Sequence, residues 1–331
     1  MLEDLKGLSL AELQEIIKGF KAREVFRFIH QHVKEDISEL TCLALAEREQ
    51  LAEKYFISKL DPQKTSTENE TNKVAFKLED GKLVETVSLK DKENRVTLCV
   101  SSQVGCPIGC SFCATGKMGF KRNLTVAEIL SQVYHFAKSE KVSNIVFMGM
   151  GEPFLNFNNV IASARILNHP LGQNLAARKI TISTIGILSG IKKLAEVPEQ
   201  FRLAWSMVAP NDGARGELIP SKYNEPLSRI IAALKDYQKT TKRRITIEYV
   251  VLGGVNDSEK DISELAKISK QLDSHVNLIA YNPVEGSPYK EGNIKLMFIT
   301  LRKAGVNATI RQSRGRKISA ACGQLAGQSE A

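Results

Sequence analysis

The stretch Cys106-Pro-Ile-Gly-Cys110-Ser-Phe-Cys113 places three cysteines within eight residues. This C-x3-C-x2-C spacing holds three thiolates in one tight loop, close enough together to bind one soft metal centre. Soft sulfur ligands select zinc, copper(I) or iron–sulfur clusters. An iron–sulfur cube normally takes four cysteines, so a loop of three leaves one iron open for chemistry. A structural zinc site needs a fourth Cys or His, and none follows the loop before His135.

The spacing resembles that of the radical S-adenosylmethionine (SAM) enzymes, in which the open iron binds the amino and carboxylate groups of SAM. This resemblance implies a [4Fe–4S] cluster held by Cys106, Cys110 and Cys113, with SAM as the second cofactor. The alternative is three unligated core cysteines. Buried structural cysteines, however, have no reason to gather in a loop that contains Gly105 and Gly109.

Length and composition limit the class of protein. A chain of 331 residues with 43% hydrophobic residues suggests one large domain, alone or with a small companion. It contains no run of 18 apolar residues and no signal-peptide pattern at Met1-Leu2-Glu3-Asp4, so we expect a soluble, cytoplasmic protein. Six cysteines, three of them in the metal loop, fit a reducing compartment. The net charge of +9 suits a polyanionic partner such as RNA.

The first 94 residues divide into two predicted parts. Residues 1–60 read as a small domain of short helices, beginning with a capping box in which Glu12 follows Ser9 by three residues. Residues 61–94 read as a linker and a β-hairpin. The polar stretch 64–72 forms the linker or the hairpin entry, and strands 74–78 and 83–89 flank an Asp-Gly turn.

From residue 95 onward, strand-like runs alternate with amphipathic helical runs such as 125–138, 226–239 and 258–272. This alternation predicts a parallel sheet. The fold class is therefore α/β, a partial (β/α)6 barrel over residues 95–312 with its site at the carboxyl ends of the strands. Residues 313–331 form a C-terminal tail. The predicted barrel strands are 96–100, 144–148, 179–183, 202–207, 245–251 and 276–280.

Polar or glycine residues follow several of these strands. Gly151 and Glu152 lie in a Gly-rich turn, where the backbone can approach a ligand closely and the carboxylate could accept hydrogen bonds from the SAM amine. Ser183 and Ser206 could bind ribose or carboxylate, and Asn282 could bind an adenine edge. Each residue alone is more often a local cap, so the evidence is their shared position at successive strand ends.

Two further cysteines suggest covalent chemistry. Cys99 lies in the first barrel strand, and Cys322 lies near the C-terminus among small residues that would leave its thiol accessible. One thiol can carry a group, and the other can release the product by thiol–disulfide exchange. Cys99 could equally be a small core residue, whereas a mobile tail offers Cys322 no core to fill. Cys42 reads as plain packing in the helical domain.

Several segments together closely resemble the RlmN/Cfr family of radical SAM adenosine methyltransferases. Besides the metal loop they are 99–106, 147–153, 183–184, 254–257, 281–283 and 320–325. The resemblance implies that one SAM methylates Cys322 and that a second is cleaved to a 5′-deoxyadenosyl radical. That radical takes hydrogen from the methyl group, and the resulting carbon radical adds to an adenine carbon. Cys99 then forms a disulfide with Cys322 and releases the product. Glu85 matches the family's proton acceptor, a role for which Cys99 competes.

The resemblance also implies partners. The substrates would be adenosine 2503 of 23S rRNA and, for dual-specificity members, adenosine 37 of certain tRNAs, with helices 1–60 as a candidate RNA-binding part. An electron donor such as flavodoxin or ferredoxin is required, and a monomer is the simplest state. Val104, Arg314 and Gly315 favour methylation of C2 over C8. Candidate phosphate contacts are Lys117, Lys121, Arg122, Lys242, Arg243, Arg244, Arg311, Arg314, Arg316 and Lys317.

The chain departs from the family pattern at two places. The segment Ser206-Met207-Val208 counts among the expected SAM contacts, yet Val208 stands where the family has His and brings no side-chain donor. Arg316, Lys317 and Ser319 replace the usual acidic residues beside Cys322. Three alternatives stay open. They are a C8-methylating member of the family, another radical SAM enzyme, although the chain lacks the three additional clustered cysteines that a second cluster requires, and a zinc-stabilised RNA-binding protein without catalysis.

Overall fold

A computed structural model describes residues 2–220 and 222–326. Within them one ten-stranded sheet has the order β14-β13-β12-β11-β10-β9-β6-β5-β4-β3. Strands β6 and β9 to β14 run parallel, and β3, β4, β5 and β6 pair antiparallel. The strands are β3 (Asp61–Glu68), β4 (Thr71–Lys77), β5 (Leu83–Lys90), β6 (Val96–Cys99), β9 (Val142–Phe147), β10 (Ile180–Thr184), β11 (Arg202–Ser206), β12 (Ile245–Val251), β13 (His275–Ala280) and β14 (Ala308–Arg311).

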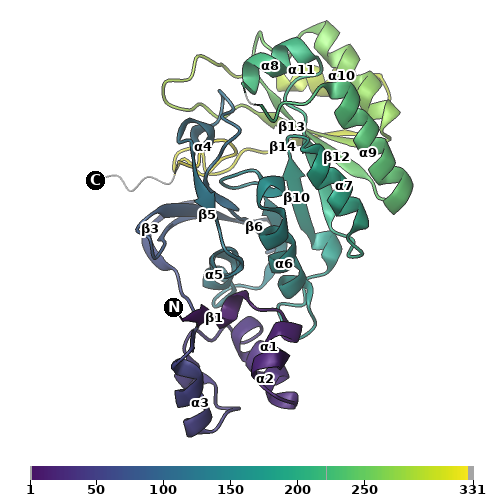
Figure 1. Cartoon of the computed structure of the whole chain (residues 1–331). Helices are drawn as coiled ribbons and strands as arrows, with labels where there is room; N and C mark the ends of the chain where they lie inside the picture. The colour runs from purple at the N-terminus through teal and green to yellow at the C-terminus, as the bar shows by residue number, and fades with distance from the viewer. Residues whose placement is uncertain (1, 221, 327–331) are drawn as a thin grey trace.

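Helices connect successive parallel strands and cover the outer side of the sheet, while the C-terminal tail lies on the opposite side (Figure 1). This is the partial α/β barrel that the alternating pattern predicts. Both faces of the central strands are covered, so Leu203, Trp205 and Ile247 are fully buried or nearly so. The helices are α5 (Val126–Ala137), α6 (Phe157–Asn168), α7 (Leu188–Glu196), α8 (Asp212–Leu218), α9 (Leu227–Thr241), α10 (Glu259–Gln271) and α11 (Ile294–Lys303).

Two strands differ from the sequence-based expectation. The polar stretch expected as a linker or hairpin entry is mostly strand β3, which pairs antiparallel with β4. Its side chains are largely exposed because it is an edge strand, and this exposure removes the alternation that normally reveals a strand. Strand β14 adds a seventh parallel strand beyond the six expected. Its four residues are too few to show a pattern.

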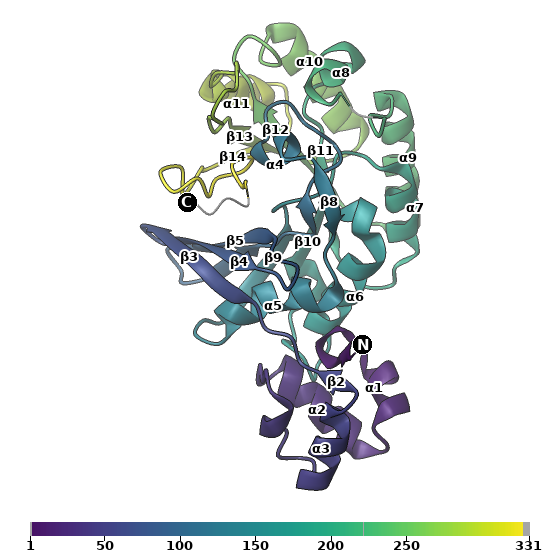
Figure 2. The ribbon, with the colours of Figure 1, turned by 60° about the vertical axis from the view of Figure 1, so that its left-hand side comes forward.

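The N-terminal helices α1 (Leu10–Ile16), α2 (Phe20–His30) and α3 (Leu45–Ala52) form a separate group at one end of the molecule (Figure 2). The Ser9–Glu12 capping box is present. Lys6 joins this group to the barrel because its ammonium group donates to the Ser58 carbonyl and to Ser131 Oγ on α5, the latter at 2.9 Å. The side chain is fully buried, with Glu35 at 3.8 Å. Burial lowers the pKa of Lys6 to about 8.

The tail closes the open seam of the barrel between β14 and the antiparallel strands. It continues from β14 and reaches across to β5, where Arg314 Nη1 donates to the Lys90 carbonyl at 2.7 Å. The Lys317 amide donates to Glu68 Oε2 on β3 at 3.0 Å. Figures 1 and 2 both show the tail beside the short helix α4 (Ala114–Lys117), which follows the cysteine loop. No helix in the described part of the chain is long and apolar enough to cross a membrane.

Replacing Lys6 tests the junction between the helical group and the barrel. We expect Lys6→Ala to lower the free energy of unfolding by about 3 kcal/mol, because buried acceptors lose a charged donor. Lys138→Ala is the matched control, since Lys138 pairs with the same Glu35 but is 47% exposed; its loss costs at most about 1 kcal/mol. Urea unfolding measures both. Equal effects of the two substitutions would contradict the assigned role of Lys6.

Candidate active site

The loops at the carboxyl ends of the parallel strands enclose a central cavity of about 180 Å³. All three loop cysteines line it, together with Cys322 from the tail. The expected cofactor-binding residues Gly151, Glu152, Ser183, Ser206 and Val208 line it as well. The structure therefore brings together residues that lie more than 200 positions apart in sequence, at the end of the barrel where the parallel-sheet rule places a site.

The cysteine loop is shaped by close backbone contacts. The Cys106 amide donates to the Gly119 carbonyl at 3.1 Å, and β7 (Gln103–Gly105) pairs with β8 (Phe120–Asn123) beneath the loop. Gly105 has a φ of +70°, and a Cβ there would lie 1.7 Å from the Gly119 carbonyl oxygen. Only glycine fits this position, so the loop conformation depends on it.

The donor set fits an iron–sulfur cube. Burial raises the pKa of the Cys106 thiol to about 12 and also raises the pKa of Cys110 and Cys113, so the bare thiolates need a cationic centre to be stable. Among the described residues no three His, Cys, Asp or Glu side chains are arranged to hold a single metal ion. A cube takes its ligands at separate corners, so three thiols that line one cavity could each bind a different iron.

Glu152 links the loops that follow β9 and β10. Its carboxylate accepts hydrogen bonds from the Phe154 amide at 3.1 Å and from the Ile185 amide at 3.0 Å. Only 4% of the residue is exposed, and burial raises the pKa of its carboxyl to about 7. The carboxylate is therefore fixed at the cavity wall in an environment that favours a cationic ligand.

Ser183 and Ser206 place their hydroxyl oxygens 3.1 Å apart on neighbouring strands β10 and β11. Val208 lies just beyond β11 with a φ of +67°, a strained conformation for a β-branched residue. Asn256 stabilises it by donating to the Val208 carbonyl at 2.7 Å. Met207 is fully buried and does not line the central cavity, so its side chain is not placed to contact a ligand there.

Arg215 is a buried residue that the sequence analysis missed. Its guanidinium is fully buried and donates to the Met207 carbonyl at 2.6 Å and the Ile185 carbonyl at 2.5 Å. It thereby ties together the loops after β10 and β11. An arginine in the first turn of a short helix carries no sequence signal for burial, so the sequence analysis does not single it out.

Asn282 has a different set of partners from the one expected. Its side-chain amide donates to the Cys322 carbonyl at 3.1 Å and its oxygen accepts from Arg316 Nε at 2.8 Å. The amide therefore holds the tail rather than standing free for an adenine edge. Helix α4 holds the tail from the other side, through the Ala114 amide to the Gly323 carbonyl at 2.7 Å and Thr115 Oγ1 to the Leu325 carbonyl at 2.5 Å.

Cys322 lies where two cavities meet. Besides the central cavity it lines a second one of about 90 Å³, here called the seam cavity, which Cys99 and Arg311 also line. Burial raises the pKa of Cys99 to about 12. The tail is docked and Cys322 is only partly exposed, contrary to the expectation of a mobile, unscreened thiol. Docking places the second expected cysteine beside the first.

Glu85 faces a third space, an open basin of about 650 Å³ outside the tail. The residue is only 2% exposed. Its carboxylate lies 2.8 Å from Lys73 Nζ and accepts from the Ala326 amide at 2.8 Å. Glu85 lines the basin and Cys99 lines the seam cavity, so the two candidate proton acceptors face different spaces.

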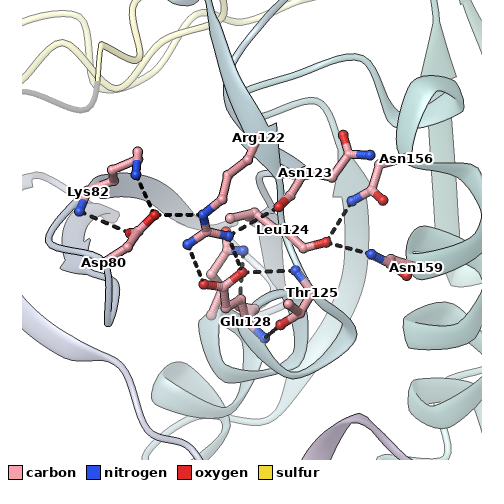
Figure 3. A network of polar contacts seen from close by, with 10 residues as sticks. Asp80, Lys82, Arg122, Asn123, Leu124, Thr125, Glu128, Asn156 and Asn159 are labelled. Carbon is pink, nitrogen blue, oxygen red and sulfur yellow. Dashed lines mark hydrogen bonds and ion pairs between the residues drawn. The ribbon is translucent and has the colours of Figure 1, made fainter. Parts of the chain in front are cut away.

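The candidate phosphate contacts fall into distinct groups. Lys117 and Lys317 line the basin, with Lys64 and Lys73 beside them. Arg122 instead binds Asp80 and Glu128, each at 2.7 Å (Figure 3). Arg311 is inside the seam cavity. Residues 242–244 immediately precede β12, so they lie at the amino end of the strands, away from the site. The basin therefore gathers four lysines beside the tail.

Comparison with known proteins agrees with this arrangement. The model of the radical SAM superfamily matches residues 100–266. The "Probable dual-specificity RNA methyltransferase RlmN" of Thermus thermophilus is 42% identical over 93% of this chain and 89% of its own. The "Ribosomal RNA large subunit methyltransferase N" of Nitrosopumilus maritimus is 40% identical over 98% of both chains. A crystal structure of a radical SAM methyltransferase from Sphaerobacter thermophilus superposes with a TM-score of 0.92 at 41% identity, over 98% of this chain and 100% of that one.

Enzymes of this superfamily use a [4Fe–4S] cluster and SAM, the two cofactors that the three-cysteine loop indicated. Identity at this level extends over nearly the whole length of the chain and includes the tail, so it is not limited to the shared barrel. The chain belongs to the RlmN family of radical SAM RNA methyltransferases.

Proposed function

We propose that this protein methylates C2 of adenosine in RNA, at position 2503 of 23S rRNA and at position 37 of tRNA. The observation that carries the proposal is the position of Cys322, which lines one cavity with the three loop cysteines and another with Cys99. Such RNA substrates imply action in the cytoplasm, with an electron donor such as flavodoxin or ferredoxin. The protein would act as a monomer.

Cys106, Cys110 and Cys113 would hold the cluster, which supplies the electron that cleaves SAM to a 5′-deoxyadenosyl radical. The role of the remaining residues follows from their positions. Glu152 would bind the SAM ammonium group, and Ser183 and Ser206 present hydroxyls on the same wall. Cys322 would carry the methyl group, since its partial exposure in the central cavity leaves its sulfur within the space where SAM binds.

Cys99 would release the product. Its thiolate attacks Cys322 sulfur to form a disulfide, the carbon–sulfur bond breaks, and the carbon takes that electron pair and a proton to become the methyl group. A thiol with a pKa of about 12 is protonated at neutral pH, so this step needs a base. Glu85 lines the basin, the proposed path of the RNA, which suits a proton acceptor toward the RNA base.

Nucleoside analysis tests the function directly. RNA incubated anaerobically with the cluster-loaded protein, SAM and a reductant should yield 2-methyladenosine by mass spectrometry. Cys322→Ala should cleave SAM but transfer no methyl group, because the carrier sulfur is gone. Cys99→Ala should accumulate a covalent protein–RNA adduct, visible as a band shift under denaturing conditions. A methyl group at C8, or normal transfer by Cys322→Ala, would refute the proposal.

Substitution of Glu152 tests the SAM contact. The Glu152 carboxyl loses its proton near pH 4.5 in the unfolded chain, whereas in the folded protein without cluster its pKa is about 7. The resulting stabilisation is complete below pH 4.5 and lost as pH rises through 7. Relative to Glu152→Gln, the wild type should therefore lose about 3 kcal/mol of unfolding free energy between pH 4.5 and 8.

The same variant separates stability from binding. At pH 8 Glu152→Gln should unfold at no lower urea concentration than the wild type, yet bind SAM more weakly by about tenfold, the loss of one charge-assisted hydrogen bond. Urea titration of the cluster-free protein and equilibrium dialysis of the loaded protein measure the two effects. Equal affinity for SAM in both proteins would show that Glu152 only links the loops after β9 and β10 and does not bind SAM.

The basin is the proposed path of the RNA strand, because Lys64, Lys117 and Lys317 surround it next to the tail. Lys317→Glu changes the local charge by two units. It should therefore weaken RNA binding and make the slope of log K against log salt concentration less steep. Lys242→Glu makes the same charge change at the other end of the barrel and is the control. Filter binding across salt concentrations measures both. Equal weakening by the two variants would mean that net charge, not the basin, attracts the RNA.

A further inference from the structure

Arg316 contacts the loop after β13 at three points. Its Nε donates to Asn282 Oδ1 at 2.8 Å and its Nη2 donates to the Tyr281 carbonyl at 3.2 Å. Its Nη1 lies 2.7 Å from Glu291 Oε1. The fork of a guanidinium is rigid and planar, so three simultaneous contacts fix its orientation. The residue thus joins the first half of the tail to the barrel.

The contact with Asn282 determines which way that amide faces. An asparagine side chain can present either its oxygen or its nitrogen to a neighbour, and a guanidinium can only donate. Arg316 therefore requires the oxygen of Asn282 on its own side, which directs the nitrogen to the opposite side. That nitrogen donates to the Cys322 carbonyl at 3.1 Å. Asn282 is only 2% exposed, so water has little access to replace either partner.

The other tail contacts do not hold Cys322 itself. Helix α4 binds the carbonyls of Gly323 and Leu325, the residues that follow. Arg314 and Lys317 bind β5 and β3 before it. The carbonyl of Cys322 is bound by Asn282, so the backbone position of this cysteine depends on the amide that Arg316 orients.

We propose that Arg316 is a positioning residue for Cys322, acting through Asn282 to hold the cysteine where the central and seam cavities meet. A carboxylate at position 316 could only accept, so it would favour the nitrogen of Asn282 on its own side and turn the amide away from the Cys322 carbonyl. Only the catalytic consequence of this proposal rests on the proposed carrier role of Cys322. Its structural consequence, a restrained Cys322, stands separately and is measurable without RNA.

Thiol alkylation in the cluster-loaded protein tests the restraint. The cluster protects three cysteines, so iodoacetamide under anaerobic conditions reports on Cys322, Cys99 and Cys42 by peptide mass spectrometry. Arg316→Ala should raise the alkylation rate of Cys322 by about three- to tenfold, the worth of one lost hydrogen bond. Cys42 lies in the N-terminal helical group and should react at its wild-type rate, as an internal control for global loosening.

Matched variants separate the relay from a general loss of charge. Arg165 on α6 forms a comparable, partly exposed ion pair with Glu199. Arg165→Ala should therefore leave the alkylation rate of Cys322 unchanged. Arg316→Lys, which retains one cationic donor, should restore part of the restraint. Asn282→Ala should match the effect of Arg316→Ala, and the double variant should react no faster than Asn282→Ala alone, because both act along one path.

Kinetics complete the test. Arg316→Ala should lower the rate of Cys322 methylation while KM for SAM stays unchanged, since Arg316 does not line the central cavity. An alkylation rate of Cys322 within twofold of wild type, or additive effects of the two substitutions, would overturn the proposal. If Cys322 is loosened as expected but wild-type protein never methylates it, the carrier role fails and the positioning role stands.

Discussion

The docking of the C-terminal tail over the open seam of the barrel is the constraint on which the site depends. The barrel alone places the cysteine loop, Glu152 and the two serines at the carboxyl ends of its strands. Only the tail brings Cys322 to them and sets it beside Cys99. Backbone hydrogen bonds from helix α4 and the amide of Asn282 fix the tail. Because α4 directly follows the cysteine loop, the segment proposed to bind the cluster also positions the proposed carrier.

Burial gives the site its chemical character. The same desolvation raises the pKa values of Cys106 and Glu152, so a cationic partner is needed to stabilise the ionised form of each. A cluster and the ammonium group of SAM are such partners, and they would reverse these shifts when they bind. Lys64, Lys73, Lys117 and Lys317 line the basin outside the tail, and their charge suits a polyanion.

Much of the fold could be predicted from sequence because apolar, strand-like runs alternate with amphipathic helical runs along the chain. Residues 245–251 were predicted to the residue, and the ends of the other five predicted barrel strands differ by at most two positions. Strand β3 was not predicted because an exposed edge strand needs no apolar face. The burial of Arg215 was not predicted because a single buried cation leaves no sequence pattern. The partners of Asn282 could not be foreseen, since they belong to a tail whose path depends on the open seam. Motif spacing, strand-end position and family resemblance predicted the candidate site residues, whereas their division among three spaces required the tertiary structure.

The central claim is that Cys322 and Cys99 act as a pair across the seam cavity. The most direct measurement is disulfide mapping by mass spectrometry after a single anaerobic turnover with RNA and without added thiol. The account predicts one disulfide, between Cys99 and Cys322, in an amount equal to the methylated adenosine formed. Methylated product without that disulfide, or with a disulfide between other cysteines, would contradict it.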